Sequence, residues 1–222
     1  RLCLAMRGSS IGRPDITTWR RAQGTLLSRA TRIRVPSIDA RDRLLQHFRS
    51  LQTVTVAGFD DTAPAPLRRS ARAQGVTLRI GVIGVIGVLK GYHTMLACAD
   101  HARRSGCTIQ FVVMGYTMDD DRARRAGIEI DGPYDDAEAM DRLARLDLDG
   151  LFYPSAWPET WSYTLSIGLA SGLPIVAFDI GAIAERLRAA GRGRLLPLSD
   201  RRRPHAIIAA LSEEARGTTG AI

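Results

Sequence analysis

Lys90 stands in a loop that has the residue types of an anion-binding site. It lies between Gly87 and Gly91, after a long apolar run and before an amphipathic segment. Glycines there would let the backbone approach a ligand closely, and the N–H groups of a helix start attract phosphate. The alternative is a plain strand-to-helix turn with a solvated lysine. Since Lys90 is the only lysine in the chain, its position is informative.

A second loop, residues 153–165, carries Glu159 between two prolines and a predicted helix start. A half-buried carboxylate needs a polar partner, and hydroxyls of a bound sugar or a neighbouring arginine would serve. Backbone N–H groups of residues 160–163 would form a second anion-binding feature at the first turn. Alternatively, Glu159 is only a helix N-terminal acid that the helix dipole favours. We expect Trp157 and Trp161 to pack under the loop rather than to stack on a ligand.

Apolar runs alternate with amphipathic segments from residue 77 onward, which predicts a parallel sheet covered by helices on both faces. The fold class is therefore α/β, a doubly wound Rossmann-like sheet whose ligands bind outside the carboxyl ends of the strands. The expected strands are 77–85, 109–114, 128–130, 150–153, 175–178 and 195–196, and the expected helices are 92–104, 120–126, 137–146, 162–171, 182–190 and 204–215.

Residues before this alternation form a smaller and incomplete α/β piece. Helices are expected over 15–30 and 38–48, with short strands at 33–35 and 54–56. Prolines, alanines and paired aspartates then indicate a linker. The predicted domains are 1–58, a linker over 59–76, a ligand-binding domain over 77–200, and a terminal helix and tail over 201–222. Because the chain does not begin with methionine, we expect it to continue a longer sequence.

Composition excludes several classes of protein. With 222 residues, 45% hydrophobic and 24% charged, the chain is neither disordered nor collagen-like. The net charge of +8 belongs to residues 1–50, where eleven arginines face three aspartates, so nucleic-acid binding is not expected. A peripheral membrane contact through that basic segment stays open. The longest apolar run is too short to span a bilayer. Cys3, Cys98 and Cys107 are expected to be free, buried thiols in a reducing compartment.

Other motifs predict no metal and no cofactor. Asp119–Asp121 has an Asp-x-Asp spacing, but acids are favoured at a helix start and we expect no metal there. Gly81, Gly84 and Gly87 are spaced unlike a dinucleotide fingerprint.

Taken together, the two loops and the residues between them resemble the carboxyl-terminal, donor-binding domain of GT-B glycosyltransferases, specifically the retaining family-four group. The residues before the linker resemble the end of the acceptor domain of these enzymes. The motifs that carry the resemblance are Lys90-Gly91, Gly115, Gly132-Pro133-Tyr134, Pro154 to Glu159, Gly172 to Ala177, Gly181 and Glu185.

The resemblance implies a cytoplasmic enzyme, with membrane association left open, that moves a sugar from a nucleotide diphosphate to a saccharide or lipid-linked acceptor in surface polysaccharide synthesis. Lys90 would neutralise the leaving diphosphate, and Glu159 would hold hydroxyls of the donor sugar. Residues 132–134 would lie against the base, and the backbone of 160–163 would bind the phosphates. The implied donor-binding residues are Gly87, Gly91, Gly115, Tyr116, Gly132, Pro133, Tyr134, Thr160, Trp161, Ser162, Tyr163 and Thr164.

Two positions depart from the family pattern. The family usually has a second glutamate where this chain has Ile167, and an arginine where it has Val85. Each loss of a charge-assisted hydrogen bond weakens binding by ~1.5–3 kcal/mol. Ser166 or Ser171 are candidates to compensate for Ile167. The alternative function is a catalytically silent domain that binds a nucleotide sugar or a protein partner.

Overall fold

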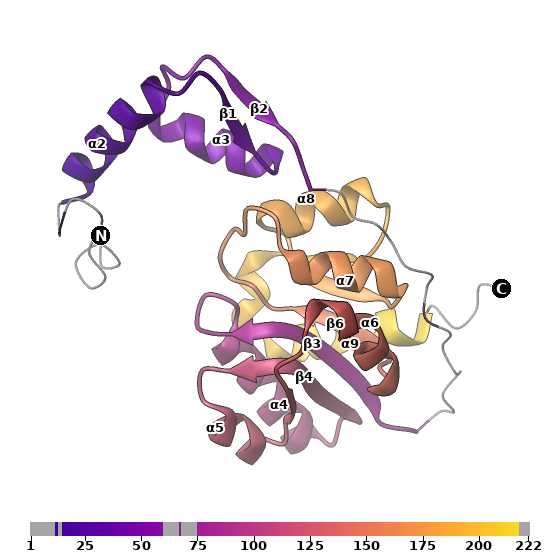
Figure 1. Cartoon of the computed structure of the whole chain (residues 1–222). Helices are drawn as coiled ribbons and strands as arrows, with labels where there is room; N and C mark the ends of the chain where they lie inside the picture. The colour runs from indigo at the N-terminus through magenta and orange to yellow at the C-terminus, as the bar shows by residue number, and fades with distance from the viewer. Residues whose placement is uncertain (1–11, 13–14, 60–66, 68–74, 218–222) are drawn as a thin grey trace. The chain divides into compact units, whose positions relative to one another are not determined.

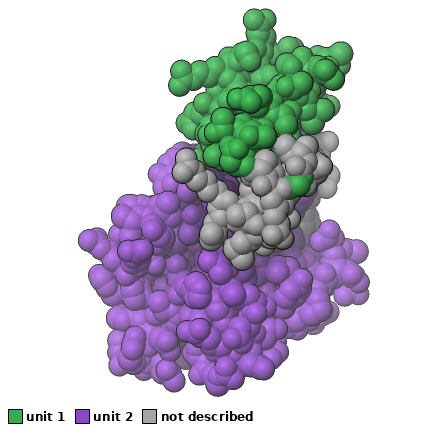
Figure 2. Space-filling model, turned by 90° about the vertical axis from the view of Figure 1, so that its left-hand side faces the viewer, with its two compact units in different colours: residues 1–59 green, residues 60–222 purple. Residues whose placement is uncertain are grey.

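The computed structural model describes residues 12, 15–59, 67 and 75–217. The chain divides into two compact units, residues 1–59 and 60–222 (Figure 2). Most of the predicted linker over 59–76 lies outside the described residues, as does Cys3. Within the described part of the chain, no helix is long and apolar enough to cross a membrane.

The described residues of the first unit contain two helices and a pair of short strands. The order is α2 (Ile16–Ser28), β1 (Ile33–Val35), α3 (Ile38–His47) and β2 (Val54–Val56). The two strands pair in parallel. Asp15 and Ser37 cap the helices by accepting backbone N–H groups. Among the described residues of this unit, no apolar side chain is buried, so this part of the chain lacks a core of its own.

The second unit is a six-stranded parallel sheet with helices on both faces (Figure 1). Its strand order is β5-β4-β3-β6-β7-β8, the order of a Rossmann-type sheet. The predicted α/β doubly wound fold is confirmed. The strands are β3 (Leu78–Ile86), β4 (Ile109–Thr117), β5 (Glu129–Gly132), β6 (Gly150–Tyr153), β7 (Ile175–Phe178) and β8 (Arg194–Leu196). The helices are α4 (Tyr92–Ser105), α5 (Asp120–Arg125), α6 (Ala139–Arg145), α7 (Tyr163–Ser171), α8 (Gly181–Ala189) and α9 (Pro204–Gly217), with short 3-10 helices η1 (Asp136–Glu138) and η2 (Leu198–Arg202).

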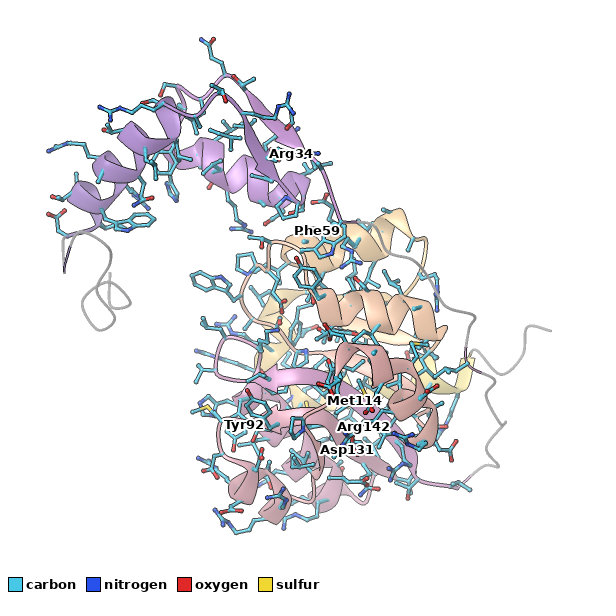
Figure 3. The ribbon with its side chains drawn as sticks, viewed as in Figure 1. Arg34, Phe59, Tyr92, Met114, Asp131 and Arg142 are labelled. Carbon is cyan, nitrogen blue, oxygen red and sulfur yellow. The ribbon has the colours of Figure 1, made fainter. Side chains whose placement is uncertain are left out.

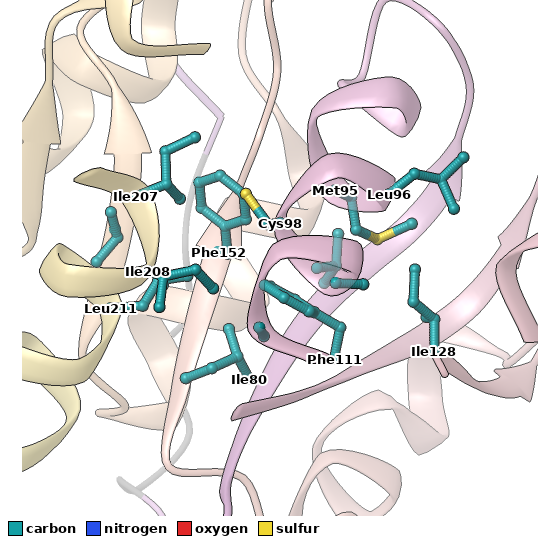
Figure 4. Close-up of a cluster of buried hydrophobic side chains, with 14 of the residues drawn as sticks. Ile80, Met95, Leu96, Cys98, Phe111, Ile128, Phe152, Ile207, Ile208 and Leu211 are labelled. Carbon is teal, nitrogen blue, oxygen red and sulfur yellow. The ribbon is translucent and has the colours of Figure 1, made fainter. Parts of the chain in front are cut away.

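Alternate side chains of the strands build two separate cores. On β4, Phe111 and Val113 join the core that contains α4, α5 and α9, whereas Val112 and Met114 join the core under α6, α7 and α8. Figure 4 shows the first core, to which Phe152 and Cys98 both belong. Burial raises the pKa of the Cys98 thiol to about 12. Cys107 is exposed, so the expectation of a buried thiol was wrong at this position, which follows the end of α4.

The strand order fixes where a ligand-binding crevice can form. The chain winds outward from β3 through β4 to β5, and then returns to place β6 on the other side of β3. Ile80 of β3 pairs with Gly150 of β6. The connections leaving these two neighbours run in opposite directions, which opens a crevice at their carboxyl ends. The Lys90 loop follows β3 and the Glu159 loop follows β6, so both stand at this point.

Candidate functional site

A cavity of about 640 Å³ opens at the carboxyl ends of the strands. This volume lies within the range of small-molecule sites. Its walls come from the loops after β3, β4, β5 and β6, far apart in sequence. The lining residues are Gly84, Val85, Lys90, Gly115, Tyr116, Pro133, Tyr134, Asp136, Trp157, Pro158, Glu159, Thr160, Trp161, Ser162, Tyr163 and Thr164.

Gly91 brings the Lys90 loop against the Glu159 loop. Its φ is +84°, and a Cβ there would lie 2.0 Å from the Pro154 carbonyl oxygen. The Ala156 N–H also donates to the Leu89 carbonyl oxygen at 3.1 Å. The glycine is thus required by contact with the protein itself. At Gly87, in contrast, a Cβ would point into open space, and the φ is ordinary.

Lys90 and Glu159 meet across the crevice. The Lys90 Nζ lies 3.7 Å from the Glu159 Oε2, and the side chains are 38% and 17% exposed. The Ser155 hydroxyl donates to the other carboxylate oxygen, Oε1, at 2.6 Å. The polar partners of the carboxylate within the protein are therefore a hydroxyl and an ammonium, and no arginine of the described residues takes that place. Solvent still reaches the lysine, so an anionic ligand has access to it.

The turn before α7 has an unusual backbone. The helix begins at Tyr163, one residue later than expected, and Ser162 has φ 73° and ψ 89°. A positive φ is uncommon outside glycine. The Ser162 side chain does not cap the helix; its Oγ lies 3.3 Å from the Thr164 Oγ1. Ser162, Tyr163 and Thr164 line the cavity, so the N-terminal end of α7, which attracts anions through the helix dipole, lies at this wall.

The opposite wall comes from the loops after β4 and β5. Gly115 has φ +129°, and a Cβ there would meet the Gly84 carbonyl oxygen at 2.2 Å, so the two strand ends approach closely only because of this glycine. Tyr134 is half-buried. Burial is the main cause that raises the pKa of its hydroxyl, and the negative charge of the nearby Asp136 raises it further. Tyr116 is exposed at the rim. The wall offers aromatic and apolar surface beside a carboxylate.

Two arginines of the covering helices hold the cavity walls through backbone carbonyl oxygens. Arg142 of α6 donates to the Pro133 carbonyl oxygen at 2.9 Å and pairs with the Asp131 carboxylate (Figure 3). Arg186 of α8 donates to the Trp161 and Ser162 carbonyl oxygens. Neither arginine was predicted as a site residue. Arginines make up all but one of the 31 basic residues, so a single one carries no signal in the sequence.

Most predicted site residues line the cavity. Gly87, Gly91 and Gly132 are outside its lining, and Asp136, Gly84 and Pro158 line it without having been predicted. The expectation for Trp157 was wrong. It is 57% exposed and lines the cavity, although Pro154 and Ser155 of the same loop are buried. Trp161 is half-buried and also lines the cavity, and the Arg186 guanidinium carbon lies 4.0 Å from its ring centroid.

The two departures from the family pattern differ in their surroundings. Val85 is 49% exposed and lines the cavity. Ile167 packs against the core under α7 and is outside the lining. Ser171 is buried and its hydroxyl donates to the Gly168 carbonyl oxygen, so it does not compensate for Ile167. Ser166 accepts from Arg186 and also lies outside the lining.

The acidic run at the start of α5 has structural partners. The Asp119 carboxylate caps the helix by accepting the Arg122 N–H at 2.9 Å. Asp120 accepts both the backbone N–H and the hydroxyl of Thr117. Among the described residues, no group of three or more histidine, cysteine or acidic side chains is arranged to hold a metal ion.

Solved structures with a similar fold include three named proteins. TarM of S. aureus has a TM-score of 0.63 at 14% identity, over 90% of this chain and 42% of TarM. HepE of Anabaena, solved with UDP and glucose, has a TM-score of 0.63 at 16% identity, over 91% of this chain and 62% of HepE. The pneumococcal O-GlcNAc transferase GtfA, solved with UDP and GlcNAc, has a TM-score of 0.59 at 16% identity, over 90% of this chain and 40% of GtfA.

At the sequence level, no protein-family model and no curated protein matches this chain. The chain spans between 40% and 62% of the length of the three proteins compared. At such identities the similarity concerns the fold. The described residues therefore have the Rossmann-like α/β fold of GT-B glycosyltransferases.

Proposed function

We propose that this chain binds a nucleoside diphosphate sugar in the cavity and transfers the sugar to a hydroxyl of an acceptor. The observation that carries the proposal is the 3.7 Å approach of Lys90 to Glu159 at the switch point of the sheet. Two proteins of the same fold, HepE and GtfA, were solved with UDP, which supports a nucleotide ligand. In this proposal the second unit is the donor-binding domain, and residues 1–58 belong to an acceptor domain.

Lys90 acts on the leaving group. During transfer, the bond between the anomeric carbon and a diphosphate oxygen breaks, and its electron pair stays with the diphosphate. The acceptor oxygen forms the new bond with the anomeric carbon, and its hydroxyl proton passes to the departing diphosphate. A fixed cation near the developing charge stabilises the transition state, most strongly where water is excluded. The ammonium is held by Glu159 and is partly exposed, so the diphosphate can bind it directly.

Glu159 holds the donor sugar. Because the Ser155 hydroxyl fixes Oε1, the carboxylate has a defined orientation before any ligand binds. Its oxygens are acceptors that match sugar hydroxyls, and such charge-assisted hydrogen bonds are stronger than neutral ones. The turn at residues 160–163 would bind the phosphates, and Pro133 and Tyr134 would lie against the base. Retention of configuration and a saccharide or lipid-linked acceptor in polysaccharide synthesis are proposed from the motif resemblance. No metal or cofactor is needed in this scheme.

A silent nucleotide-sugar binder is the second candidate. Val85 exposes an apolar side chain on the cavity wall, and the partly buried Ile167 packs against the core. Neither can form the hydrogen bonds that the family pattern places there. In that case the cavity would bind the nucleotide without transfer.

Calorimetry with UDP, GDP and ADP, and then with their sugars, tests the proposal. We expect one base to be preferred and the Lys90→Met variant to bind its diphosphate about 10-fold more weakly, because one charge-assisted contact is lost. Glu159→Gln should weaken binding of the nucleotide sugar more than that of the nucleotide alone. Arg104→Met is the matched control, since it removes one exposed positive charge at the other end of α4.

Each outcome separates the candidates. Binding with sugar release or transfer in the parent chain, lost in both variants, supports the transferase. Binding that depends on Lys90 and Glu159 without any sugar release supports the silent binder. Absence of binding to all three diphosphates and their sugars would overturn both.

A further inference from the structure

Arg186 connects α8 to the turn before α7. The residue is 8% exposed. Its Nη1 donates to the Trp161 carbonyl oxygen at 3.1 Å and to the Ser162 carbonyl oxygen at 2.8 Å, and its Nη2 donates to the Ser166 hydroxyl at 2.9 Å. The guanidinium also lies over the Trp161 ring. One side chain thus holds the turn at two successive carbonyls and at the first helical turn that follows.

The hydrogen bonds of Arg186 determine the direction of the neighbouring backbone N–H groups. In a planar trans peptide, the C=O and the N–H point in opposite directions. Since the carbonyls of Trp161 and Ser162 point to Arg186, the N–H groups of Ser162 and Tyr163 point away from it. Both of these residues line the cavity, whereas Arg186 does not. The two N–H groups are therefore directed to the cavity side of the turn.

The conformation that Arg186 holds is an uncommon one. Ser162 has a φ of 73°. For a residue other than glycine this conformation is less favourable than the ordinary one, and it persists when surrounding contacts determine it. The two hydrogen bonds of Arg186 on either side of Ser162 supply such contacts. These acceptors are neutral, so they leave the positive charge of the guanidinium behind the turn.

We propose that Arg186 is a positioning residue for the donor diphosphate. It directs the Ser162 and Tyr163 N–H groups and the α7 N-terminus toward the phosphates without contacting the ligand. The inference rests on the proposed function, because it assigns the phosphates to this wall of the cavity. It goes beyond that function because it proposes that a buried residue of another helix, α8, determines the affinity for the diphosphate.

The test compares UDP with uridine by calorimetry in the full chain. In Arg186→Lys, the single ammonium cannot reach both carbonyls and the hydroxyl, or stack as a plane on Trp161. We expect the UDP affinity to fall about 10- to 30-fold while the uridine affinity changes less than twofold. Ser166→Ala, which leaves the arginine in place, should lower the UDP affinity about two- to threefold and keeps the test valid if Arg186→Lys does not fold.

Arg192→Gln is the matched control. Arg192 donates to the Leu169 carbonyl oxygen at 2.9 Å, at the other end of α7, and its partners lie away from the cavity. Thermal unfolding of all variants measures how much stability each loses. A general structural effect would lower UDP and uridine affinity together, and in Arg192→Gln as well. A selective loss for UDP in the Arg186 and Ser166 variants alone supports positioning.

Inorganic pyrophosphate separates this inference from the proposed function. If the parent chain binds pyrophosphate but no nucleotide, the proposed function fails, and a lower pyrophosphate affinity in Arg186→Lys still supports the positioning role. If UDP binds equally well to a folded Arg186→Lys, the positioning role is wrong and the proposed function stands. A parent chain that binds neither UDP nor pyrophosphate overturns both.

Discussion

Val85 is an exposed apolar residue on the cavity wall where a positive charge can be added. Its side chain is half exposed at the end of β3, close in sequence to Lys90. An arginine there would place a second cation on the wall without entering the core. We expect Val85→Arg to tighten UDP binding about 10-fold, equivalent to ~1.4 kcal/mol, and to make binding more sensitive to salt. Calorimetry at two salt concentrations measures both effects.

Val88→Arg is the control for Val85→Arg. Val88 is exposed to a similar extent in the loop that directly follows β3, but it lies outside the cavity lining. A cation there should change UDP affinity less than threefold. Equal gains in both variants would show that net charge, rather than the cavity, is responsible.

Ser162 permits a test of backbone strain. Its left-handed conformation costs about 1–2 kcal/mol, and glycine would remove this cost while losing about 0.5–1 kcal/mol of chain entropy. We therefore expect the unfolding free energy of Ser162→Gly to stay within about 1 kcal/mol of the parent. A β-branched residue adopts this φ least readily, so Ser162→Val should lose about 2 kcal/mol. Urea unfolding measures both, and a Val variant as stable as the Gly variant would contradict the argument.

Residue types in the sequence identified some residues of the site but not others. Lys90 was identifiable because it is the only lysine, and Glu159 because it follows a proline-rich loop. Arg142 and Arg186 were not identifiable, since arginine is frequent throughout the chain and both hold the cavity walls through backbone carbonyl oxygens. Every residue has a backbone carbonyl oxygen, so a hydrogen bond to one cannot be recognised from residue types. Roles of this kind emerge only from the folded geometry.

At the scale of elements, Gly91 is the residue on which the packing of two loops depends. Its φ is positive, and an added methyl group would overlap the backbone of Pro154. We expect Gly91→Ala to lower the unfolding free energy by about 3 kcal/mol, because strain and a backbone clash add. Thermal and urea unfolding measure the loss.

Gly87→Ala is the matched variant in the same loop. Nothing lies within 4 Å of a Cβ at Gly87, and its φ is ordinary. We expect its unfolding free energy to lie within about 0.5 kcal/mol of the parent. The sequence alone does not distinguish Gly87 from Gly91. If Gly87→Ala were as destabilising as Gly91→Ala, the contact with Pro154 would not be the cause.

Strands and helices of the second unit were predictable because hydrophobic periodicity reports burial along one element. The ends of these strands and helices were less predictable. β4 continues to Thr117, three residues beyond the predicted end, because it pairs with β3 along its whole length. α7 begins one residue later than predicted, after Ser162, whose carbonyl oxygen accepts a hydrogen bond from Arg186, distant in sequence. Long-range contacts of this kind have no local pattern.

At the scale of the whole molecule, the two units differ in what stabilises them. The second unit buries apolar side chains on both faces of its sheet and contains the whole cavity lining. The described residues of the first unit bury no apolar side chain, and its two strands are three residues long. An isolated two-stranded pair is marginally stable in water. Exposed ion pairs such as Arg43–Asp39 add at most about 1 kcal/mol.

Hydrogen exchange followed by mass spectrometry should therefore separate the units. Amides exchange through local opening, and the free energy of opening rises with the apolar contacts that must be broken. We expect peptides from α2, α3, β1 and β2 to exchange within seconds to minutes, and peptides from β3, β4, β6 and β7 to exchange only through global unfolding. Adding UDP should slow exchange in the turn before α7 and leave the first unit unchanged. Equal protection of both units would contradict this division, and would require that the first unit be stabilised by burial that its described residues do not show.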